Sequence, residues 1–252
     1  MVNVNHQMTI IEPKQFISSH SCNIISMLQE FSFMIIGITG LIGSGKDTIA
    51  DYLTTHHGFK RVSFAASLKD AVSAVFGWDR EYLEGTTKAS RAWREKRDEW
   101  WSNRLGMDIT PRWILQYWGT DVCRNHFHND IWVASVEHKL LNSKEDIVIT
   151  DCRFSNEVAA IKNANGIALR VKRGPDPKWY DAAVAYNRGP NGNSAWALSK
   201  GKLDKLKIHA SEYSSIGLNY DHIVENNGTI DELHNQIYEI INSQSQDHPD
   251  AK

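Results

Sequence analysis

The sequence predicts an α/β fold with a central five-stranded parallel sheet flanked by helices. Short apolar runs alternate along the chain with segments whose apolar residues recur at helical spacing, which is typical of strand–helix–strand units. The apolar runs are continuous rather than alternating, as in strands that are buried on both faces. With 252 residues, of which 41% are hydrophobic and 23% charged, the chain has the composition of a globular protein with a sizeable core.

The five predicted strands cover residues 34–39, 61–64, 147–150, 167–171 and 222–225. The first is a β-branched run that ends at Thr39 and is followed by Gly40. A helix is expected from about Lys46 to Gly58, between the first two strands. Because parallel strands need crossover connections, the helices are expected to cover both faces of the sheet.

Capping residues predict where several helices begin. Ser67 with Asp70 predicts a capping box for the helix after the second strand, and Ser155 is the expected cap of the helix after the third. Thr229 with Glu232 predicts another capping box, for the last helix. The apolar residues of that helix recur at helical spacing, namely at Ile230, Leu233, Ile237, Ile240 and Ile241.

One domain is expected over residues 34–242. Residues 1–33 are interpreted as an N-terminal extension and residues 243–252 as a flexible polar tail. The segment 78–110, dense in charge and tryptophan, interrupts the strand–helix alternation and is expected to be an insertion. Segment 172–207 interrupts it again, and its glycines and prolines predict a loop-like excursion.

Charge and cysteine content exclude several classes of protein. The net charge of −2 argues against a chain whose main role is to coat nucleic acid or a membrane surface. No stretch approaches the roughly 18 apolar residues of a membrane helix, so a soluble protein is expected. Three cysteines without a CxxC pair indicate a reducing compartment and neither a disulfide framework nor a thiolate zinc site. The oligomeric state is left open, a homodimer included.

A phosphate-binding loop is predicted at residues 40–48. The sequence GLIGSGKDT matches the pattern GxxxxGK, and it follows a predicted strand and opens a predicted helix, which is the context that such a loop requires. Its glycines let backbone N–H groups surround a polyphosphate, and the lysine can reach the β- and γ-phosphates. The candidate ATP-binding residues are Gly43, Ser44, Gly45, Lys46, Asp47 and Thr48.

The residue after the lysine departs from this pattern. A serine or threonine hydroxyl that binds Mg²⁺ is expected there, and this chain has Asp47 followed by Thr48. Two metal candidates follow, Thr48 directly and Asp47 through a water molecule. An orienting role for the Asp47 carboxylate is the alternative.

A short helix is predicted after Thr110, which is a good N-cap, with Pro111 in its first turn and Gly119 at its end. Arg112, Gln116 and Gly119 would then share one face. A guanidinium, an amide and a close backbone approach suit a phosphate together with a base edge. The alternative is an amphipathic surface helix without a ligand.

A second cluster, Asp151-Cys152-Arg153, follows the predicted strand 147–150. Ligands of open α/β sheets collect at the carboxyl ends of the strands, so Asp151 and Arg153 are candidate site residues, although a structural ion pair between them is the alternative. Glu157 lies in the first turn of the next helix, where the helix dipole alone would favour an acid. Seven of nine tryptophans fall within residues 78–132; most are expected to be packing residues, and Trp132 is a candidate for stacking on a base.

With these residues identified, the chain resembles the deoxynucleoside monophosphate kinases of tailed bacteriophages over most of residues 34–242. The resemblance rests on ordered motifs, which are GSGKDT (43–48), FAASLKDAV (64–72), PRxxLQxxGTD (111–121), DIWV (130–133), DCRFxNE (151–157) and HASE (209–212). It implies a P-loop kinase fold and transfer of the γ-phosphoryl group of ATP, with Mg²⁺, to a deoxynucleoside 5′-monophosphate. Such a reaction supplies precursors for phage DNA synthesis in the host cytoplasm.

The resemblance also implies roles for individual residues. Those near the chemistry would be Lys46, Arg112, Asp151 and Arg153. The acceptor nucleotide would be lined by Ile42, Leu68, Lys69, Arg112, Gln116, Gly119, Thr120, Trp132, Asp151, Arg153 and Glu157. Ile42 stands where a member of the family can carry a lysine, and segment 78–110 varies greatly in the family, so base selectivity stays open.

Beside a phosphate site, segment 172–207 is interpreted as a basic lid. It carries eight Lys and Arg residues against three Asp, and Arg173 and Arg188 are its candidates for closing over the phosphates. Small-molecule nucleotides are the expected partners, with no nucleic acid and no membrane. Two alternatives stay open, a kinase with another acceptor such as dephospho-coenzyme A and a nucleotide-binding switch without transferase activity.

Overall fold

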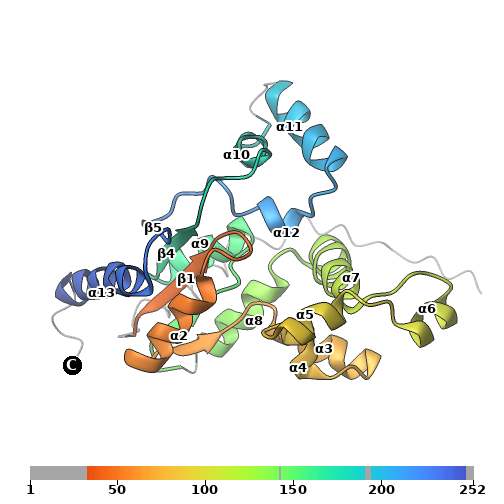
Figure 1. Ribbon diagram of the computed structural model, residues 1–252, viewed down its shortest axis with the longest axis horizontal. Coiled ribbons are helices and arrows are strands. Elements are labelled where there is room, and N and C mark those ends of the chain that lie inside the picture. The colour runs from red at the N-terminus through yellow and green to blue at the C-terminus, as the bar shows by residue number, and fades with distance from the viewer. Residues whose placement is uncertain (1–32, 142, 191–193, 248–252) are drawn as a thin grey trace, which may run out of the picture.

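The computed structural model describes residues 33–141, 143–190 and 194–247 (Figure 1). Its centre is a sheet of five parallel strands in the order β2-β3-β1-β4-β5, which confirms the predicted fold class. The strands are β1 (Ile35–Thr39), β2 (Lys60–Val62), β3 (Ile147–Ile149), β4 (Ile167–Lys172) and β5 (His222–Glu225). They lie within three residues of the predicted bounds.

Both faces of the sheet are covered by helices. Helices α2 (Lys46–His56) and α13 (Ile230–Asp247) pack on one face, where Ile36 and Ile38 of β1 point. Helices α8 (Ile131–Leu140) and α9 (Ser155–Asn163) pack on the other face, against Ile35. Because the central strands are buried on both sides, their sequences are continuously apolar, as predicted.

A separate group of helices lies beside the sheet (Figure 1). It comprises α3 (Ala66–Phe76), α4 (Arg80–Glu84), α5 (Lys88–Arg94), α6 (Glu99–Leu105), α7 (Pro111–Gln116) and the π-helix η1 (Tyr117–Phe127). Its core is Leu68, Val72, Trp78, Leu83, Ile109 and Ile114. Five further tryptophans pack against this core, at positions 93, 101, 113, 118 and 132, which confirms that most of the tryptophans are packing residues.

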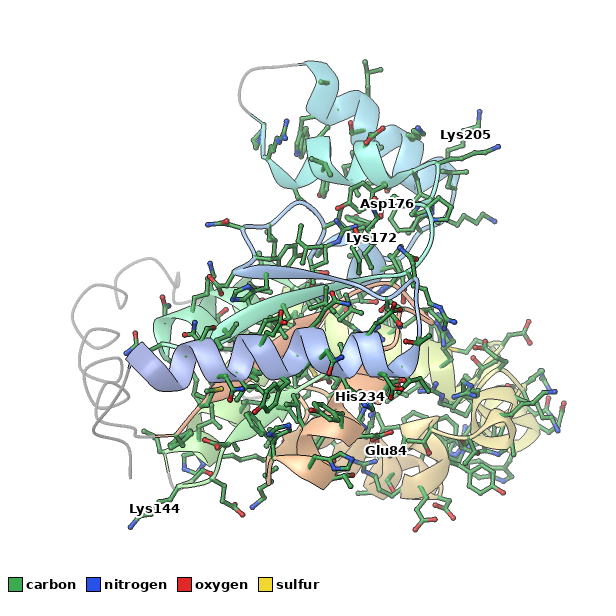
Figure 2. The ribbon with its side chains drawn as sticks, turned by 60° about the vertical axis from the view of Figure 1, so that its left-hand side comes forward. Glu84, Lys144, Lys172, Asp176, Lys205 and His234 are labelled. Carbon is green, nitrogen blue, oxygen red and sulfur yellow. The ribbon has the colours of Figure 1, made fainter. Side chains whose placement is uncertain are left out.

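The segment predicted as a loop-like lid is helical. It contains α10 (Tyr180–Asn187) and α11 (Ser194–Lys205), and α12 (Ala210–Tyr213) follows it. These helices enclose a small core of Ala182, Ala183, Leu203, Tyr213 and Ile216. The loop prediction was wrong because the glycines and prolines lie outside α10, whose sequence is rich in alanine and apolar residues. Figures 1 and 2 show α10 and α11 standing away from the sheet.

Two predicted caps were also wrong. Helix α3 begins after Ala65, and the Ser67 hydroxyl bonds the hydroxyl of Ser135 at 2.8 Å instead of capping the helix. Ser155 is the first residue of α9, whose N-cap is Phe154. The side chain that serves this helix start is that of Glu157, which accepts a bond from the Phe154 N–H at 3.0 Å.

The last helix keeps its predicted start and overruns its predicted end. The Thr229–Glu232 capping box is present, with bonds of 2.7 and 3.2 Å. Helix α13 continues to Asp247, so it extends into the segment from residue 243 where a flexible tail is expected, and serine and glutamine residues continue the helix there. The expected extension 1–33, apart from residue 33, and residues 248–252 lie outside the described residues. Among the described helices none has the length and apolarity to cross a membrane.

Candidate functional site

The phosphate loop connects β1 to α2, as predicted, and its backbone depends on glycine. Gly40, Gly43 and Gly45 have φ angles of 149°, 78° and 105°. A Cβ at Gly40 would lie 2.5 Å from the Val171 carbonyl oxygen and 2.6 Å from the Ser44 hydroxyl. No larger residue fits there, because the loop passes directly over the end of β4. This loop between the first strand and first helix of a parallel sheet gives the chain a P-loop kinase fold.

A residue that the sequence analysis missed braces this loop from the opposite end of the chain. The Asn226 side chain, in the turn between β5 and α13, donates from Nδ2 to the Ser44 carbonyl oxygen at 2.8 Å. A Cβ at Gly45 would lie 2.3 Å from the same Nδ2. The sequence Asn-Asn-Gly at residues 226–228 is typical of a turn, and nothing in it indicates contact with a residue 182 positions earlier.

Lys46 folds back over the loop that carries it. Its ammonium donates to the carbonyl oxygens of Gly40 at 2.7 Å and Leu41 at 2.9 Å. Burial lowers the pKa of Lys46, and the positive charge of Arg153 lowers it further. The loop also holds a buried hydroxyl, that of Ser44, which has no hydrogen-bond partner among the described residues. A polyphosphate, which brings negative charge and acceptor oxygens, fits this set of groups.

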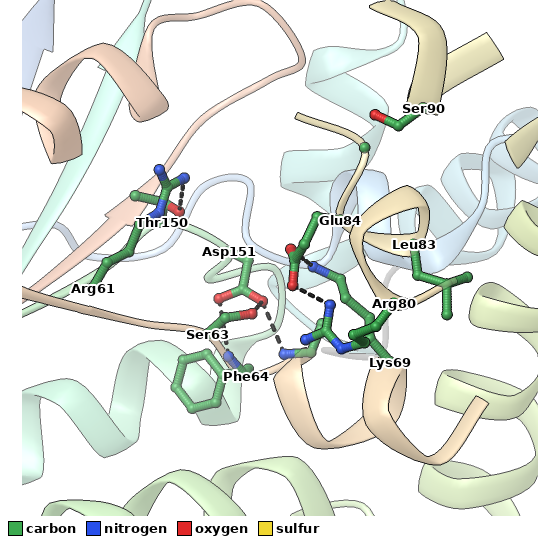
Figure 3. Close-up of polar contacts among 12 residues, drawn as sticks. Arg61, Ser63, Phe64, Lys69, Arg80, Leu83, Glu84, Ser90, Thr150 and Asp151 are labelled. Atoms are coloured by element: carbon green, nitrogen blue, oxygen red, sulfur yellow. Dashed lines mark hydrogen bonds and ion pairs between the residues drawn. The ribbon is translucent and has the colours of Figure 1, made fainter. Parts of the chain in front are cut away.

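Asp47, the residue that departs from the pattern, is held by Arg61, the middle residue of β2. The two form an ion pair. Arg61 also donates to the Thr150 hydroxyl at 3.0 Å, as Figure 3 shows. The Asp47 carboxylate stays largely exposed and Thr48 lies partly buried beside it. Carboxylate and hydroxyl oxygens are ligands that suit Mg²⁺, so both metal candidates fit the ion, and their role stays a prediction.

Asp151, at the carboxyl end of β3, anchors the start of α3. Its carboxylate accepts bonds from the Ser63 hydroxyl at 2.7 Å and from the N–H groups of Phe64 at 3.0 Å and Ala65 at 2.9 Å (Figure 3). Among the described residues Asp151 forms no ion pair with Arg153, which pairs with Glu212. Asp151 instead connects the carboxyl edge of the sheet to α3, the first of the helices that lie beside the sheet.

Arg153 lies across a cleft from Lys46 and pairs with Glu212 of α12 at 3.1 Å. Within the HASE motif (209–212), Glu212 pairs with Arg153 and His209 caps α12. Burial lowers the pKa of His209, and the charges of Asp121 and Glu212 oppose that shift. The cleft is lined mainly by Thr39, Gly40, Leu41, Ile42, Lys46, Thr150, Asp151, Cys152, Arg153, Arg170, Tyr180, Ser211 and Glu212.

The cleft contains Arg170, a cation that the sequence analysis missed, rather than the two arginines expected from the lid. Arg170 pairs with Asp176 at 2.7 Å and lies over the ring of Tyr180 at 4.7 Å. The available signal was a charged residue near the carboxyl end of the apolar run 167–172. Arg173 and Arg188 are exposed and do not line the cleft.

Glu157 is buried, in contrast to the exposed first-turn acid that the helix dipole alone would explain. It pairs with Arg124 of η1, which sequence analysis missed, and accepts from the Arg153 N–H at 2.6 Å. Arg124 also lies over the Phe154 ring at 4.0 Å. Burial raises the pKa of Glu157 to about 7, against the opposing effect of Arg124. Glu157 therefore fixes the backbone that carries Arg153, and contact with an acceptor stays a prediction.

The predicted helix after Thr110 begins as expected and does not end as expected. The Thr110 hydroxyl accepts from the Trp113 N–H at 3.1 Å, and Pro111 follows. The chain then continues through Gly119 as the π-helix η1. A Cβ at Gly119 would lie 2.6 Å from Leu68, so this glycine serves close packing instead of helix termination.

The winding of η1 also changes which acceptor candidates lie together. The spacing that placed Gly119 on one face with Arg112 and Gln116 holds for an α-helix and not for a π-helix. Arg112 pairs with Glu95 at 3.3 Å. Trp132, the candidate for base stacking, donates to the Gly119 carbonyl oxygen at 2.9 Å and packs against the cores of both neighbouring layers.

The remaining acceptor candidates lie around this group. Lys69 pairs with Glu84 at 2.6 Å, and Glu84 also pairs with Arg80 (Figure 3). Leu68 is buried and Ile42 is 71% exposed at the tip of the phosphate loop. Thr120 lies partly buried in η1. Their acceptor roles stay predictions.

Comparison with known proteins finds relatives that match most of the chain. A protein of Acanthamoeba polyphaga mimivirus named "Putative deoxynucleotide monophosphate kinase" is 29% identical over 227 residues, covering 84% of this chain and 98% of that protein. The deoxynucleoside-5′-monophosphate kinase of Escherichia phage T5 is 26% identical over 188 residues, covering 54% and 74%. No family model matches the chain.

Solved structures that align with the chain include shikimate kinase from Aquifex aeolicus, at 13% identity and a TM-score of 0.37, covering 84% of this chain and 99% of that one. Dephospho-CoA kinase from Campylobacter jejuni aligns at 13% identity and a TM-score of 0.35, covering 84% and 97%. The two viral relatives confirm the resemblance that the motifs predict, to viral deoxynucleoside monophosphate kinases.

Proposed function

We propose that this protein is an ATP-dependent kinase that transfers the γ-phosphoryl group to deoxynucleoside 5′-monophosphates. The observation that carries the proposal is the arrangement of Lys46 and Arg153 in one cleft. Lys46 belongs to the phosphate loop, which suits a nucleoside triphosphate, and Arg153 lies where a second phosphate group would meet it. The names of the two viral relatives support the choice of acceptor.

On the donor side, the backbone N–H groups of the phosphate loop and Lys46 bind the β- and γ-phosphates. The Lys46 ammonium must then leave the carbonyl oxygens of Gly40 and Leu41, which it contacts now. Mg²⁺, when bound with ATP, would supply further neutralisation of phosphate charge, and Thr48 and Asp47 would hold it. Asp47 is positioned for this by Arg61.

On the acceptor side, phosphoryl transfer requires an in-line approach and stabilisation of charge more than a strong base. Arg153 is fixed for that role by two contacts, since Glu212 holds its guanidinium and Glu157 holds its backbone N–H. Arg112 would contact the acceptor from α7. The helical lid of α10 and α11 would close over the cleft through Tyr180 of α10, which contacts Arg170 of β4, and this closure would exclude water and limit ATP hydrolysis.

The test is a coupled ADP-release assay with ATP and Mg²⁺. The four common deoxynucleoside monophosphates, AMP and dephospho-coenzyme A are each supplied separately. The proposal expects ADP formation that depends on at least one deoxynucleotide. Turnover with dephospho-coenzyme A alone would assign a different kinase, and ATP binding without any acceptor-dependent turnover would assign a nucleotide-binding switch.

A further inference from the structure

Three arginines from different elements lie close enough that the charges of Arg112 and Arg153 act on Arg94, and Arg153 lines the cleft. Among the described residues, only two of the three have a carboxylate within ion-pair distance. Arg112 of α7 pairs with Glu95, and Arg153 pairs with Glu212. The third is Arg94, in the last turn of α5, which no carboxylate approaches within ion-pair distance in the part of the chain that the structure describes.

Arg94 is unusual in its hydrogen bonding as well. Its Nε–H is buried and has no partner among the described residues, and its one bond in this region is a long one of 3.4 Å to the Leu83 carbonyl oxygen. Burial lowers the pKa of Arg94, the charges of Arg112 and Arg153 lower it further, and the charges of Glu95 and Glu84 oppose the shift. A buried donor without an acceptor is costly, and a cation held beside two others is more so, unless an anion joins them.

The position of this guanidinium is built into the backbone. Gly85 ends α4 with a φ angle of 69°, and a Cβ there would lie 2.0 Å from Nη2 of Arg94 and 2.1 Å from Cζ. The missing side chain of Gly85 therefore makes the space that the Arg94 guanidinium fills. Two acids also act on Arg94, Glu95 more strongly than Glu84, and both have other partners. Glu95 pairs with Arg112, and Glu84 pairs with Lys69 and Arg80 (Figure 3).

We propose that Arg94 binds the phosphate of the acceptor nucleotide, a phosphomonoester dianion, together with Arg112 and Arg153, and that Gly85 positions it. This inference rests on the proposed function. A planar guanidinium offers two parallel donors to phosphate oxygens, which suits a dianion with several equivalent oxygens. Because Arg94 and Gly85 lie in segment 78–110, the proposal gives this segment a role in binding substrate as well as in packing.

The donor γ-phosphate is the other phosphate that this cluster could meet, and kinetics separate the two. Arg94→Ala should raise the KM for the deoxynucleoside monophosphate by at least about 10-fold and leave the KM for ATP within about twofold. Gly85→Ala, which displaces the guanidinium and keeps its charge, should raise the same KM by at least about threefold. Arg94→Lys should restore part of the loss, because it keeps the charge without the planar fork.

Two matched variants control for charge and for backbone strain. Arg104→Ala removes an exposed arginine from the last turn of α6, the position that Arg94 occupies in α5. Gly106→Ala strains a glycine with a φ angle of 70°, and a Cβ there would contact nothing within 4 Å. Both should leave the KM for the acceptor within about twofold.

An increased KM for ATP alone, or no change in either KM, would overturn the inference. If the wild-type protein phosphorylates no deoxynucleotide, the proposed function fails, and equilibrium binding of inorganic phosphate then tests Arg94 separately. Weaker phosphate binding in Arg94→Ala and Gly85→Ala than in their controls would still assign an anion site to Arg94. Equal binding in all five proteins would remove it.

Discussion

The donor and acceptor sides of the cleft are constructed differently. On the donor side, nine consecutive residues form a loop whose shape comes from its own glycines and whose lysine belongs to the same segment. On the acceptor side, Arg112 and Arg153 are separated by 41 positions and each is held by a carboxylate from another element. The donor side is therefore determined mainly by local sequence and the acceptor side by tertiary packing.

The largest effect is expected at the donor side. Lys46→Met should lower kcat by about 1,000-fold, because it removes the cation that stabilises charge on the transferred phosphoryl group. Steady-state kinetics with saturating acceptor measure this effect. Lys60→Met, which alters an exposed ion pair with Glu145 at the start of β2, should leave kcat unchanged. A comparable loss in both variants would contradict a specific role for Lys46.

On the acceptor side, stability should depend most on the buried pair of Arg124 and Glu157. Arg124→Met should lower the free energy of unfolding by about 3–5 kcal/mol, because it leaves the Glu157 carboxylate buried without its partner. Urea denaturation measures the loss, with the exposed Arg104→Met as the control. A loss below about 1 kcal/mol would mean that the pair contributes little to this side of the fold.

The same variant should show a defined pH dependence. Burial raises the pKa of Glu157 from 4.5 to about 7, so the folded protein binds the carboxyl proton more tightly than the unfolded chain does. The contribution of Glu157 to stability therefore falls as the pH rises from 4.5 to about 7. Arg124 opposes the increase. Without Arg124 the pKa of Glu157 should lie above 7, so stability should go on falling as the pH rises above 7. Arg124→Met should therefore cost more stability at about pH 8.5 than at about pH 6. An equal cost at both values would contradict this account of the pair.

The boundary between the two sides is tested by Arg153. Arg153→Ala should lower kcat by about 100-fold or more with the fold intact, and Glu212→Gln should lower it by less than about 10-fold, because it only loosens the guanidinium. Circular dichroism checks the fold of both variants. Near-normal turnover of Arg153→Ala would remove this residue from the chemistry.

The smallest effect is expected at Asn226, and it tests whether the phosphate loop depends on a contact from a distant part of the sequence. Asn226→Ala removes the bond to the Ser44 carbonyl oxygen and should raise the KM for ATP by roughly threefold to 10-fold without changing the KM for the acceptor. Asn227→Ala, which removes bonds to Gly174 and Glu225 instead, is the matched control. A KM for ATP that does not change would show that the loop keeps its shape without this distant contact.

The same difference explains what the sequence could predict. The five strands and the phosphate loop follow from apolar runs and from glycines that act within a few residues. The partners of Arg153 and Glu157 could not be predicted, because Glu212 and Arg124 reach them only through the packing of α12 and η1. The end of α7 was missed for a similar reason, since Gly119 is required by the approach of Leu68 and a local pattern reads it as a helix end.

The lid was misjudged through composition. Glycines and prolines at its edges suggested a loop, and the alanines and apolar residues of α10 carried the helical signal between them. Its core, formed around Ala183 and Leu203, depends on contact between two helices joined by a short connection. The two lid arginines chosen from charge alone are exposed, whereas Arg170 reaches the cleft from the sheet.

The most direct test of the central claim is the stoichiometry of products in a single reaction. ATP, Mg²⁺ and a deoxynucleoside monophosphate are incubated with the wild-type protein, and ADP and the deoxynucleoside diphosphate are quantified together by chromatography. If the donor and acceptor sites share one cleft, each phosphoryl transfer yields one ADP and one deoxynucleoside diphosphate, so the two products should form in equal amounts. ADP without the deoxynucleoside diphosphate, which means hydrolysis at a donor side that has no acceptor side, would contradict it.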